Sequence, residues 1–289
     1  MSRKDAKFVG NLDSMHIIVP LLYPGRCDNE AYISERIDLT SINNYLKEKN
    51  EKLTTAASDG EDVFKFTIFH LIVTAVMKTI MLRPKMNYFI QNKRIYERNE
   101  VTSSFVVKKK FSDDGAEALA VVHGEKWDTV NTIHDKIKRQ VYSSRSDKKD
   151  GSTEAMDIVT KLPFFLVRFV AWLARRLDVH GKVPASVISS DPYYTSVVLS
   201  NLGSIKLKSG YHHLTNWGTN SLFVIVGEKK LRPFFEKDGS FEMRDSLDIG
   251  ITIDERLADG YYYSKSIKLL KTLLENPQLL ELPLDETVK

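Results

Sequence analysis

The stretch Asp254-Glu255-Arg256-Leu257-Ala258-Asp259-Gly260 lies near the C-terminus and leads into an apolar segment. That segment, Ser264 to Glu275, places four apolar side chains on one face of a helix before Pro277 interrupts it. The four are Ile267, Leu270, Leu273 and Leu274. Gly260 supplies backbone freedom where the polar stretch meets the helix. The sequence therefore predicts a charged loop leading directly into a terminal helix that packs through one apolar face.

The overall composition is that of a globular protein able to bury a substantial core. The chain has 289 residues, of which 42% are hydrophobic and 28% are charged, and its formal net charge is +4. This balance does not indicate a nucleic-acid partner. Cys27 is the single cysteine, which excludes an intramolecular disulfide framework. The N-terminus is charged and polar rather than an apolar signal core, so we expect a cytoplasmic protein.

Hydrophobic periodicity predicts several regular elements. Helices are expected over 40–49, with Thr40 or Ser41 as N-cap, and over 67–81, before Pro84. Asp238-Gly239 predicts a hairpin turn. Strands rich in Val, Ile, Phe and Thr are expected over 35–39, 100–111, 119–123, 194–201, 221–228 and 246–253. Because helices and strands interleave without regular βαβ spacing, we predict a mixed sheet flanked by helices in a single domain, residues 1–289.

The longest apolar run extends from Pro163 to Leu173. It is too short to span a membrane, which takes about 20 apolar residues. As a helix it leaves little room for a polar face, so we expect it to be buried in the core or in a subunit interface. Two other interpretations stay open, namely contact of 163–176 with a membrane surface and a lid over an apolar substrate. The polar stretch Ser143 to Thr153 before it predicts a surface loop.

Three blocks of the chain carry a family resemblance. The first runs from Phe66 to Asn87 and has the form of a long helix followed by Pro-x-x-Asn. The second, Thr195 to Gly203, is a strand that enters Ser-Asn-Leu-Gly, and the third joins the opening stretch to the tail Leu273 to Leu280. In this order the blocks resemble the catalytic domain of the dihydrolipoyl acyltransferases of 2-oxo acid dehydrogenase complexes, a family that includes chloramphenicol acetyltransferase.

The resemblance covers about residues 30–284 and implies both a fold and an activity. The implied fold is a mixed sheet flanked by helices that usually assembles as a homotrimer, with active sites at the subunit boundaries. A coenzyme A thioester would be the co-substrate, without a covalently bound cofactor. We expect no lipoyl or subunit-binding domain, so a core subunit of a dehydrogenase complex is not the expected role.

The resemblance also assigns roles to individual residues. Ser200 matches the hydroxyl that donates to the tetrahedral oxyanion, as pre-aimed donors do in such sites. Asp259 matches a structural carboxylate that pairs with an arginine, and Arg26 is the candidate partner. Asn201 is expected to shape the turn after its strand, and His213 is a candidate for contact with substrate.

Glu255 is the departure from the family pattern Asp-His-Arg-x-x-Asp-Gly, in which the histidine is the general base. A free carboxylate is a base about two pKa units weaker than imidazole, although burial in a channel narrows this gap. One interpretation is an active acyltransferase with Glu255 as base and a preference for amine acceptors. The alternative is a non-catalytic ligand-binding or scaffold protein, in which Glu255 forms a salt bridge with Arg256 or a lysine.

The remaining histidines do not suggest another catalytic centre. His212 and His213 are adjacent in a polar loop, and on an extended backbone their side chains would point to opposite faces, poorly placed for one metal ion. We expect loop hydrogen bonding for this pair and a core position for His70. The chain lacks the Gly-x-Ser-x-Gly, His-Glu-x-x-His and P-loop motifs, so hydrolase, zinc-peptidase and P-loop functions lack support.

Overall fold

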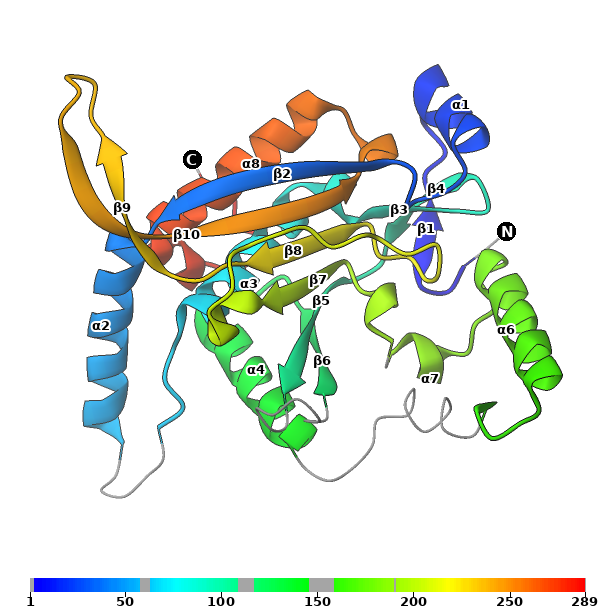
Figure 1. The fold of residues 1–289 in the computed structure, drawn as a ribbon, viewed down its shortest axis with the longest axis horizontal. Coiled ribbons are helices and arrows are strands. Elements are labelled where there is room, and N and C mark those ends of the chain that lie inside the picture. Colours follow the sequence, from blue (N-terminus) through cyan, green and yellow to red (C-terminus); the bar gives the residue numbers. More distant parts are fainter. Residues whose placement is uncertain (1–2, 58–62, 109–116, 146–158, 190, 289) are drawn as a thin grey trace.

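A computed structural model describes residues 3–57, 63–108, 117–145, 159–189 and 191–288 (Figure 1). The strands are β1 (Ala6–Phe8), β2 (Glu30–Asp38), β3 (Tyr88–Gln91), β4 (Arg94–Arg98), β5 (Val101–Lys108), β6 (Glu117–Gly124), β7 (Val197–Asn201), β8 (Leu222–Val226), β9 (Lys230–Phe235) and β10 (Phe241–Asp254). The helices are α1 (Ser14–Leu22), α2 (Thr40–Ala56), α3 (Ile68–Leu82), α4 (Val130–Arg145), α6 (Phe164–Val179), α7 (Ala185–Ile188) and α8 (Gly260–Glu275).

A seven-stranded sheet forms the centre of the molecule, with strand order β2-β10-β8-β7-β5-β6 and β9 paired to the first half of β10. The pairs β5–β7 and β7–β8 are parallel, and the other pairs are antiparallel. A second, three-stranded sheet has the order β1-β4-β3. The predicted mixed sheet flanked by helices is therefore confirmed.

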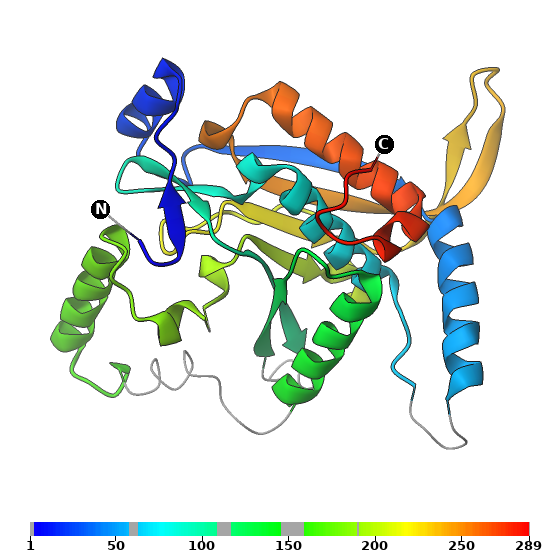
Figure 2. The same cartoon turned by 180° about the vertical axis from the view of Figure 1, so that it is seen from behind.

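One face of the large sheet is covered by α3, α4 and α8, as Figure 2 shows from behind. Every residue of α3 from His70 to Ile80 is buried, because the helix lies between the sheet and its neighbouring helices. Side chains alternate between the two faces of a strand, so Val197 and Leu199 of β7 point into this core with Val224 of β8. Most of the buried apolar side chains that the structure describes belong to this layer.

Among the described residues, no helical layer covers the centre of the opposite face of the sheet. Val198 and Phe223 point to this side and pack against Leu214, in the long loop between β7 and β8. That loop runs close to the strands: a Cβ placed on Gly250 would lie 1.9 Å from the carbonyl oxygen of Gly210. A side chain at position 250 would therefore push the loop away from the sheet.

His70 has the core position that the sequence predicts. Its Nδ1 accepts a hydrogen bond from the backbone N–H of Thr67 at 2.9 Å and so caps the first turn of α3. The ring lies 5.0 Å from the ring of His134. Burial, assisted by the nearby His134, lowers the pKa of His70 to about 3. A neutral imidazole at this position has a capping role and no access to a ligand.

Several predicted element boundaries need adjustment. The hairpin turn at Asp238-Gly239 is confirmed, with Gly239 at a φ of +86°. The N-cap predicted for the helix over 40–49, Thr40 or Ser41, is wrong. Helix α2 begins at Thr40 and continues to Ala56, and its N-cap residue is Leu39. The backbone N–H of Thr40 donates to Asp38 Oδ1 at 2.8 Å. The strand predicted from 194 begins instead at Val197, because Pro192–Tyr194 form a turn of 3₁₀ helix.

The apolar segment after Pro163 forms helix α6, but its expected burial in the core is wrong. Phe164 is 76% exposed, Phe165 70% and Trp172 57%. The helix lies at the edge of the molecule, beyond the sheet (Figure 1). Of the predicted surface loop, residues 143–145 belong to α4 and 146–153 lie outside the described residues.

Candidate active site

The charged stretch near the C-terminus forms a tight connection between a central strand and a helix. Strand β10 ends at Asp254, Glu255–Leu257 form a turn of 3₁₀ helix, and α8 begins at Gly260. Asp259 is the N-cap of α8, where its Oδ1 accepts the backbone N–H of Tyr262 at 2.7 Å. A carboxylate at this position satisfies a free N–H group and complements the helix dipole.

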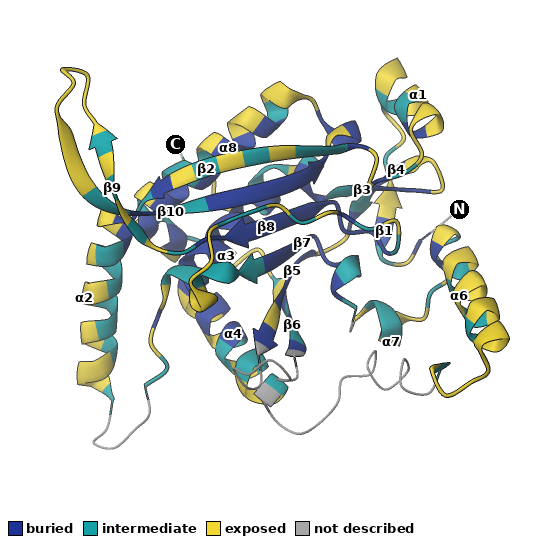
Figure 3. Cartoon of the chain, in the orientation of Figure 1, coloured by how far each residue is buried: buried dark blue, intermediate teal, exposed yellow. Residues whose placement is uncertain are grey.

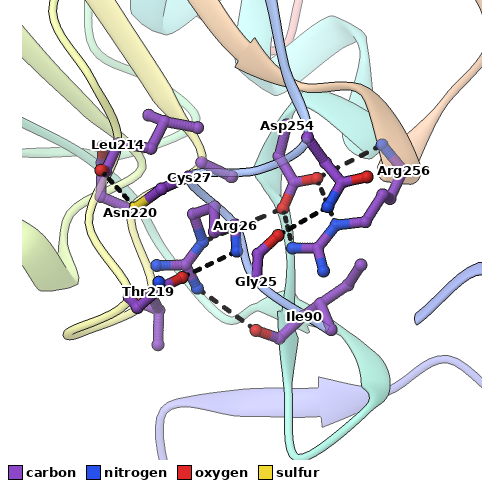
Figure 4. Close-up of polar contacts among 12 residues, drawn as sticks. Gly25, Arg26, Cys27, Ile90, Leu214, Thr219, Asn220, Asp254 and Arg256 are labelled. Atoms are coloured by element: carbon purple, nitrogen blue, oxygen red, sulfur yellow. Dashed lines mark hydrogen bonds and ion pairs between the residues drawn. The ribbon is translucent and has the colours of Figure 1, made fainter. Parts of the chain in front are cut away.

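A buried ion pair holds this turn from inside (Figure 4). Asp254 accepts two hydrogen bonds from the Arg256 guanidinium, at 2.8 Å from Nε and 2.6 Å from Nη2. The two side chains are 0% and 2% exposed. A bidentate pair of this kind has defined geometry as well as charge, and it fixes the direction of the chain between the two residues.

Arg26 completes the cluster from a distant part of the sequence. Its Nε lies 3.9 Å from Asp254 Oδ2, and its Nη1 donates to the carbonyl of Thr215 at 2.6 Å. Burial lowers the pKa of Arg26, while the charge of Asp254 opposes this shift. The predicted pairing of Arg26 with Asp259 is therefore wrong: Asp254 ends a central strand in the interior, whereas Asp259 lies at an exposed helix start.

Further bonds hold the backbone on both sides of Glu255. The backbone N–H of Glu255 donates to the carbonyl of Asn29 at 3.0 Å, and Arg256 Nη1 donates to the carbonyl of Tyr23 at 2.6 Å. From α8, the Tyr263 hydroxyl donates to the carbonyl of Asp254 at 2.9 Å, and burial raises the pKa of Tyr263 well above its ordinary value. The turn is thus connected to the loop between α1 and β2 and to helix α8.

The Glu255 side chain itself is exposed and lines a groove of about 930 Å³ between β2 and α8. Ile33, Ile253 and Ile267 form apolar parts of the wall. Arg256, the predicted partner in the non-catalytic interpretation, pairs with Asp254 instead. Among the residues that the structure describes, Glu255 forms no ion pair. Its carboxylate is therefore exposed to the groove.

Ser200 lies on the open face of the sheet and is partly buried. It pairs with Ile225 of β8, which in turn pairs with Gly250 of β10. Glu255 directly follows the end of β10, roughly 17 Å from Gly250 at the usual rise per residue. The carbonyl of Asn201, the next residue, accepts the Ser204 hydroxyl at 2.8 Å at the start of a 3₁₀ turn. Within one chain, Ser200 and Glu255 are therefore well separated.

His212 and His213 do not point to opposite faces, and that expectation is wrong. Their rings stack at 4.5 Å, and His212 also stacks on Phe223 at 4.3 Å, because this part of the loop is irregular rather than an extended strand. His212 Nδ1 lies 2.8 Å from the carbonyl oxygen of His213. Over the described ranges, no group of three or more His, Cys, Asp or Glu side chains is arranged to hold a metal ion.

The anchoring role of Asp254 is the main feature of the site that sequence reasoning missed. The signal was present: Asp254 follows an apolar strand and stands two positions before an arginine. Aspartate is almost never fully buried without a partner, so a carboxylate at the end of a buried strand calls for a nearby cation. The family pattern instead directed attention to Asp259.

Comparisons with known proteins agree with this architecture. The family described as 2-oxoacid dehydrogenases acyltransferase (catalytic domain) matches residues 190–282, which include Ser200 and the charged turn. Among solved structures, a probable dihydrolipoamide acetyltransferase from Listeria monocytogenes is 13% identical, with a TM-score of 0.60 over 93% of this chain and 95% of that chain. A comparison with curated proteins finds no significant match.

Two further structures extend the similarity. The cubic core of the pyruvate dehydrogenase multienzyme complex is 13% identical, with a TM-score of 0.61 over 95% of this chain and 94% of that chain. A chloramphenicol acetyltransferase is 12% identical, with a TM-score of 0.56 over 93% of this chain and 99% of that chain.

The fold is that of an acyltransferase catalytic domain, and the resemblance expected from the sequence is confirmed. More particularly, residues 190–282 carry the sequence pattern of the 2-oxoacid dehydrogenase acyltransferases. No helix in the described part of the chain is long and apolar enough to cross a membrane.

Proposed function

We propose that this protein is a cytoplasmic acyltransferase that moves an acyl group from a coenzyme A thioester to a nucleophilic acceptor. Glu255 acts as the general base, and Ser200 of a neighbouring subunit donates to the oxyanion. Asp259 maintains the start of α8 beside the base. Asn201, His213 and Arg26 belong to the surroundings of the site: the turn after β7, the loop over the sheet and the buried cluster.

The exposed carboxylate of Glu255 on a fixed backbone carries this proposal. Neighbouring groups hold the turn through Asp254, Arg256 and Arg26, so the side chain at 255 contributes nothing visible to its stability. If Glu255 were an exposed residue without a function, its backbone would not need to be fixed by these ion pairs and hydrogen bonds. Pre-organisation of the backbone around a reactive group is what catalysis requires, since reorganisation during the reaction is avoided.

The chemistry follows from the position of this carboxylate. Glu255 removes a proton from the acceptor as the acceptor's nitrogen or oxygen forms a bond to the thioester carbonyl carbon. The carbonyl oxygen becomes an oxyanion, to which the Ser200 hydroxyl donates. When the oxyanion collapses, the carbon–sulfur bond breaks and the proton held by Glu255 passes to the departing thiolate. A base of this kind accelerates such a reaction by about 10²–10⁴-fold.

The lining of the groove favours an amine over an anionic acceptor. Glu35, Asp259 and Glu275 line it together with Glu255, whereas Lys268 and Lys271 are its basic residues. Lys271 is already paired with Glu35 at 2.7 Å. The unpaired carboxylates leave a negative environment, which attracts an ammonium or amine and repels a carboxylate or phosphate.

A homotrimer accounts for the separation of the two reactive side chains. The distance within one chain, roughly 17 Å along the strand direction, is too long for joint action on one carbonyl group. A cubic core, such as the one formed by a structural relative, contains threefold axes at its corners. We propose that this chain forms a trimer around such an axis, with Ser200 of one subunit at the groove of the next.

Release of coenzyme A from a panel of acyl-CoA thioesters, with amine and hydroxyl acceptors, tests this function. We expect turnover by the unchanged protein and a loss of about 10²–10⁴-fold in kcat for Glu255→Gln. The matched control is Glu275→Gln, which removes another exposed carboxylate of the same groove and should retain activity. Normal turnover of Glu255→Gln contradicts its role as base. Tight acyl-CoA binding without turnover by the unchanged protein supports the alternative, a non-catalytic ligand-binding protein.

A further inference from the structure

Helix α6 presents an apolar face that nothing in the described part of the chain covers (Figure 3). Phe165, Phe169 and Trp172 recur at helical spacing and are 70%, 56% and 57% exposed. Leu166 and Leu173 widen the same face. Three exposed aromatic side chains on one face of a helix are unusual for a surface that meets only water, and such patches mark interaction sites.

Basic side chains accompany this apolar face. Arg168, Arg175 and Arg176 are exposed along the same helix, and Lys161 is exposed just before it. The single acidic residue of α6, Asp178, is buried. The outward surface of the helix is therefore apolar and positively charged. This combination favours a negatively charged, partly apolar surface over a second copy of α6, which would bring like charges together.

The C-terminal end of α6 is firmly attached to the rest of the molecule. Asp178 accepts hydrogen bonds from the Tyr194 hydroxyl at 2.8 Å and from the backbone N–H of Gly218 at 3.2 Å, and its carbonyl lies 3.5 Å from Arg3 Nη1. Val167, Val170 and Ala174 lie on the less exposed side. This attachment fixes which side faces outward, so the aromatic face points away from the molecule.

We propose that α6 lies flat on an anionic lipid bilayer and binds the protein to the membrane surface. Its 16 residues give a length of about 24 Å. In the plane of the interface, the aromatic face enters the boundary between headgroups and acyl chains, and the arginines contact anionic headgroups. Arginine side chains are long enough to extend from a partly submerged helix to the headgroups, so their guanidinium groups stay in contact with the anionic lipid. The inference does not depend on the acyl-transfer reaction.

Sedimentation with vesicles tests this inference. The vesicles are pure phosphatidylcholine, or phosphatidylcholine with about 30% phosphatidylserine. We expect binding to the anionic vesicles, little to the neutral ones, and release at about 0.5 M salt. The substitutions Phe165→Ser, Phe169→Ser and Trp172→Ser together should lower the bound fraction at least about tenfold. Arg168→Gln, Arg175→Gln and Arg176→Gln together should have a similar effect without changing the apolar face.

The matched control lies in the β9–β10 hairpin, at the opposite end of the molecule (Figure 1). Phe235 and Phe241 are 73% and 59% exposed, so Phe235→Ser with Phe241→Ser removes aromatic surface of the same kind. This variant should bind like the unchanged protein, and circular dichroism checks that all variants are folded. Unchanged binding by either α6 variant overturns the proposal, as does equal binding to both vesicles. If the variant with the three serine substitutions in α6 binds vesicles normally but has a lower mass in solution by light scattering, α6 is a subunit interface and the proposal is wrong.

Discussion

The ion pair between Asp254 and Arg256 is the residue-level feature on which the site depends. Both side chains are almost fully buried. Removing one partner leaves a buried charge without compensation, so Asp254→Asn should lower the free energy of unfolding by about 3–5 kcal/mol. Arg256→Met should have a similar effect, because the nearest cation left to the Asp254 carboxylate is then Arg26, at 3.9 Å. Guanidinium unfolding measures both changes.

The double variant separates this pairing from general disruption. If the two side chains stabilise each other, the combined loss is smaller than the sum of the single losses, by an interaction energy of about 0.5–3 kcal/mol. Additive losses would show that the two residues act independently. Glu255→Gln is the matched control in the same turn, and we expect it to change stability by less than about 0.5 kcal/mol, because its side chain is exposed.

His70 provides a pH-dependent prediction. Its pKa is about 3 in the folded protein and 6.5 in an unperturbed histidine, so the unfolded chain binds one more proton between these values. The stability associated with the neutral ring is fully present above pH 6.5 and is lost as the pH falls toward 3. The slope is about 1.4 kcal/mol per pH unit.

His70→Gln retains an acceptor for the Thr67 N–H and removes the titrating ring. Urea unfolding of both proteins between about pH 7 and pH 4 should show a shallower pH dependence for the variant. Parallel curves for the two proteins would mean that His70 is protonated in the folded state.

Single residues were the level at which sequence reasoning was least complete. The apolar pattern around His70 was sufficient to predict its core position. The sequence identified Arg26 as a partner for a carboxylate but assigned it to Asp259 instead of Asp254. Which carboxylate lies near Arg26 depends on the direction of the chain at the end of β10. The stacking of His212 on Phe223 depends on an irregular loop, for which the sequence has no periodic pattern.

At the level of elements, the side chain that caps the start of α2 differs between the sequence prediction, Thr40 or Ser41, and the structure, Asp38. Asp38 accepts hydrogen bonds from both the backbone N–H and the hydroxyl of Thr40, at 2.8 Å and 2.6 Å. Asp38→Ala should therefore cost about 1 kcal/mol of stability, whereas Ser41→Ala should cost little. Thermal unfolding measures both.

Asp38 also pairs with Arg244 at 3.1 Å, so Arg244→Gln serves as the control for loss of this ion pair. A cost of Arg244→Gln equal to that of Asp38→Ala would assign the whole effect to the ion pair. A larger cost for Ser41→Ala would restore the N-cap predicted from the sequence.

Whether a segment forms a helix was easier to predict from the sequence than whether that helix is buried or exposed. Periodicity identified the buried α3 and also indicated a helix at α6, since both segments repeat apolar residues at helical spacing. It could not show that α3 is surrounded by other elements while the aromatic face of α6 is uncovered. Which surface is covered depends on contacts between distant segments, or on partners outside the chain.

The arrangement of subunits provides a prediction at the level of the whole molecule. If Glu255 of one subunit acts with Ser200 of its neighbour, Glu255→Gln and Ser200→Ala proteins should each be nearly inactive. Unfolding and refolding an equal mixture should restore activity, to roughly one quarter of the unchanged protein, because that fraction of boundaries contains both intact residues.

Each variant refolded alone is the control, and coenzyme A release is the measurement. No recovery in mixed assemblies of confirmed trimers would show that the two residues do not share a site between neighbours. The fold itself was predictable from three sequence blocks in order, whereas the separation of Ser200 and Glu255 within one chain required the register of β7, β8 and β10.

The turn at the end of β10 also bears on how this protein can change. Its backbone is held by the residues before and after position 255, and by segments near Tyr23 and Asn29, none of which senses the side chain at 255. Position 255 is therefore exchangeable: the reactive group can be replaced while its support remains. A substitution at 255 should therefore alter the chemistry presented to the groove while the turn and the strand–helix connection around it stay as they are.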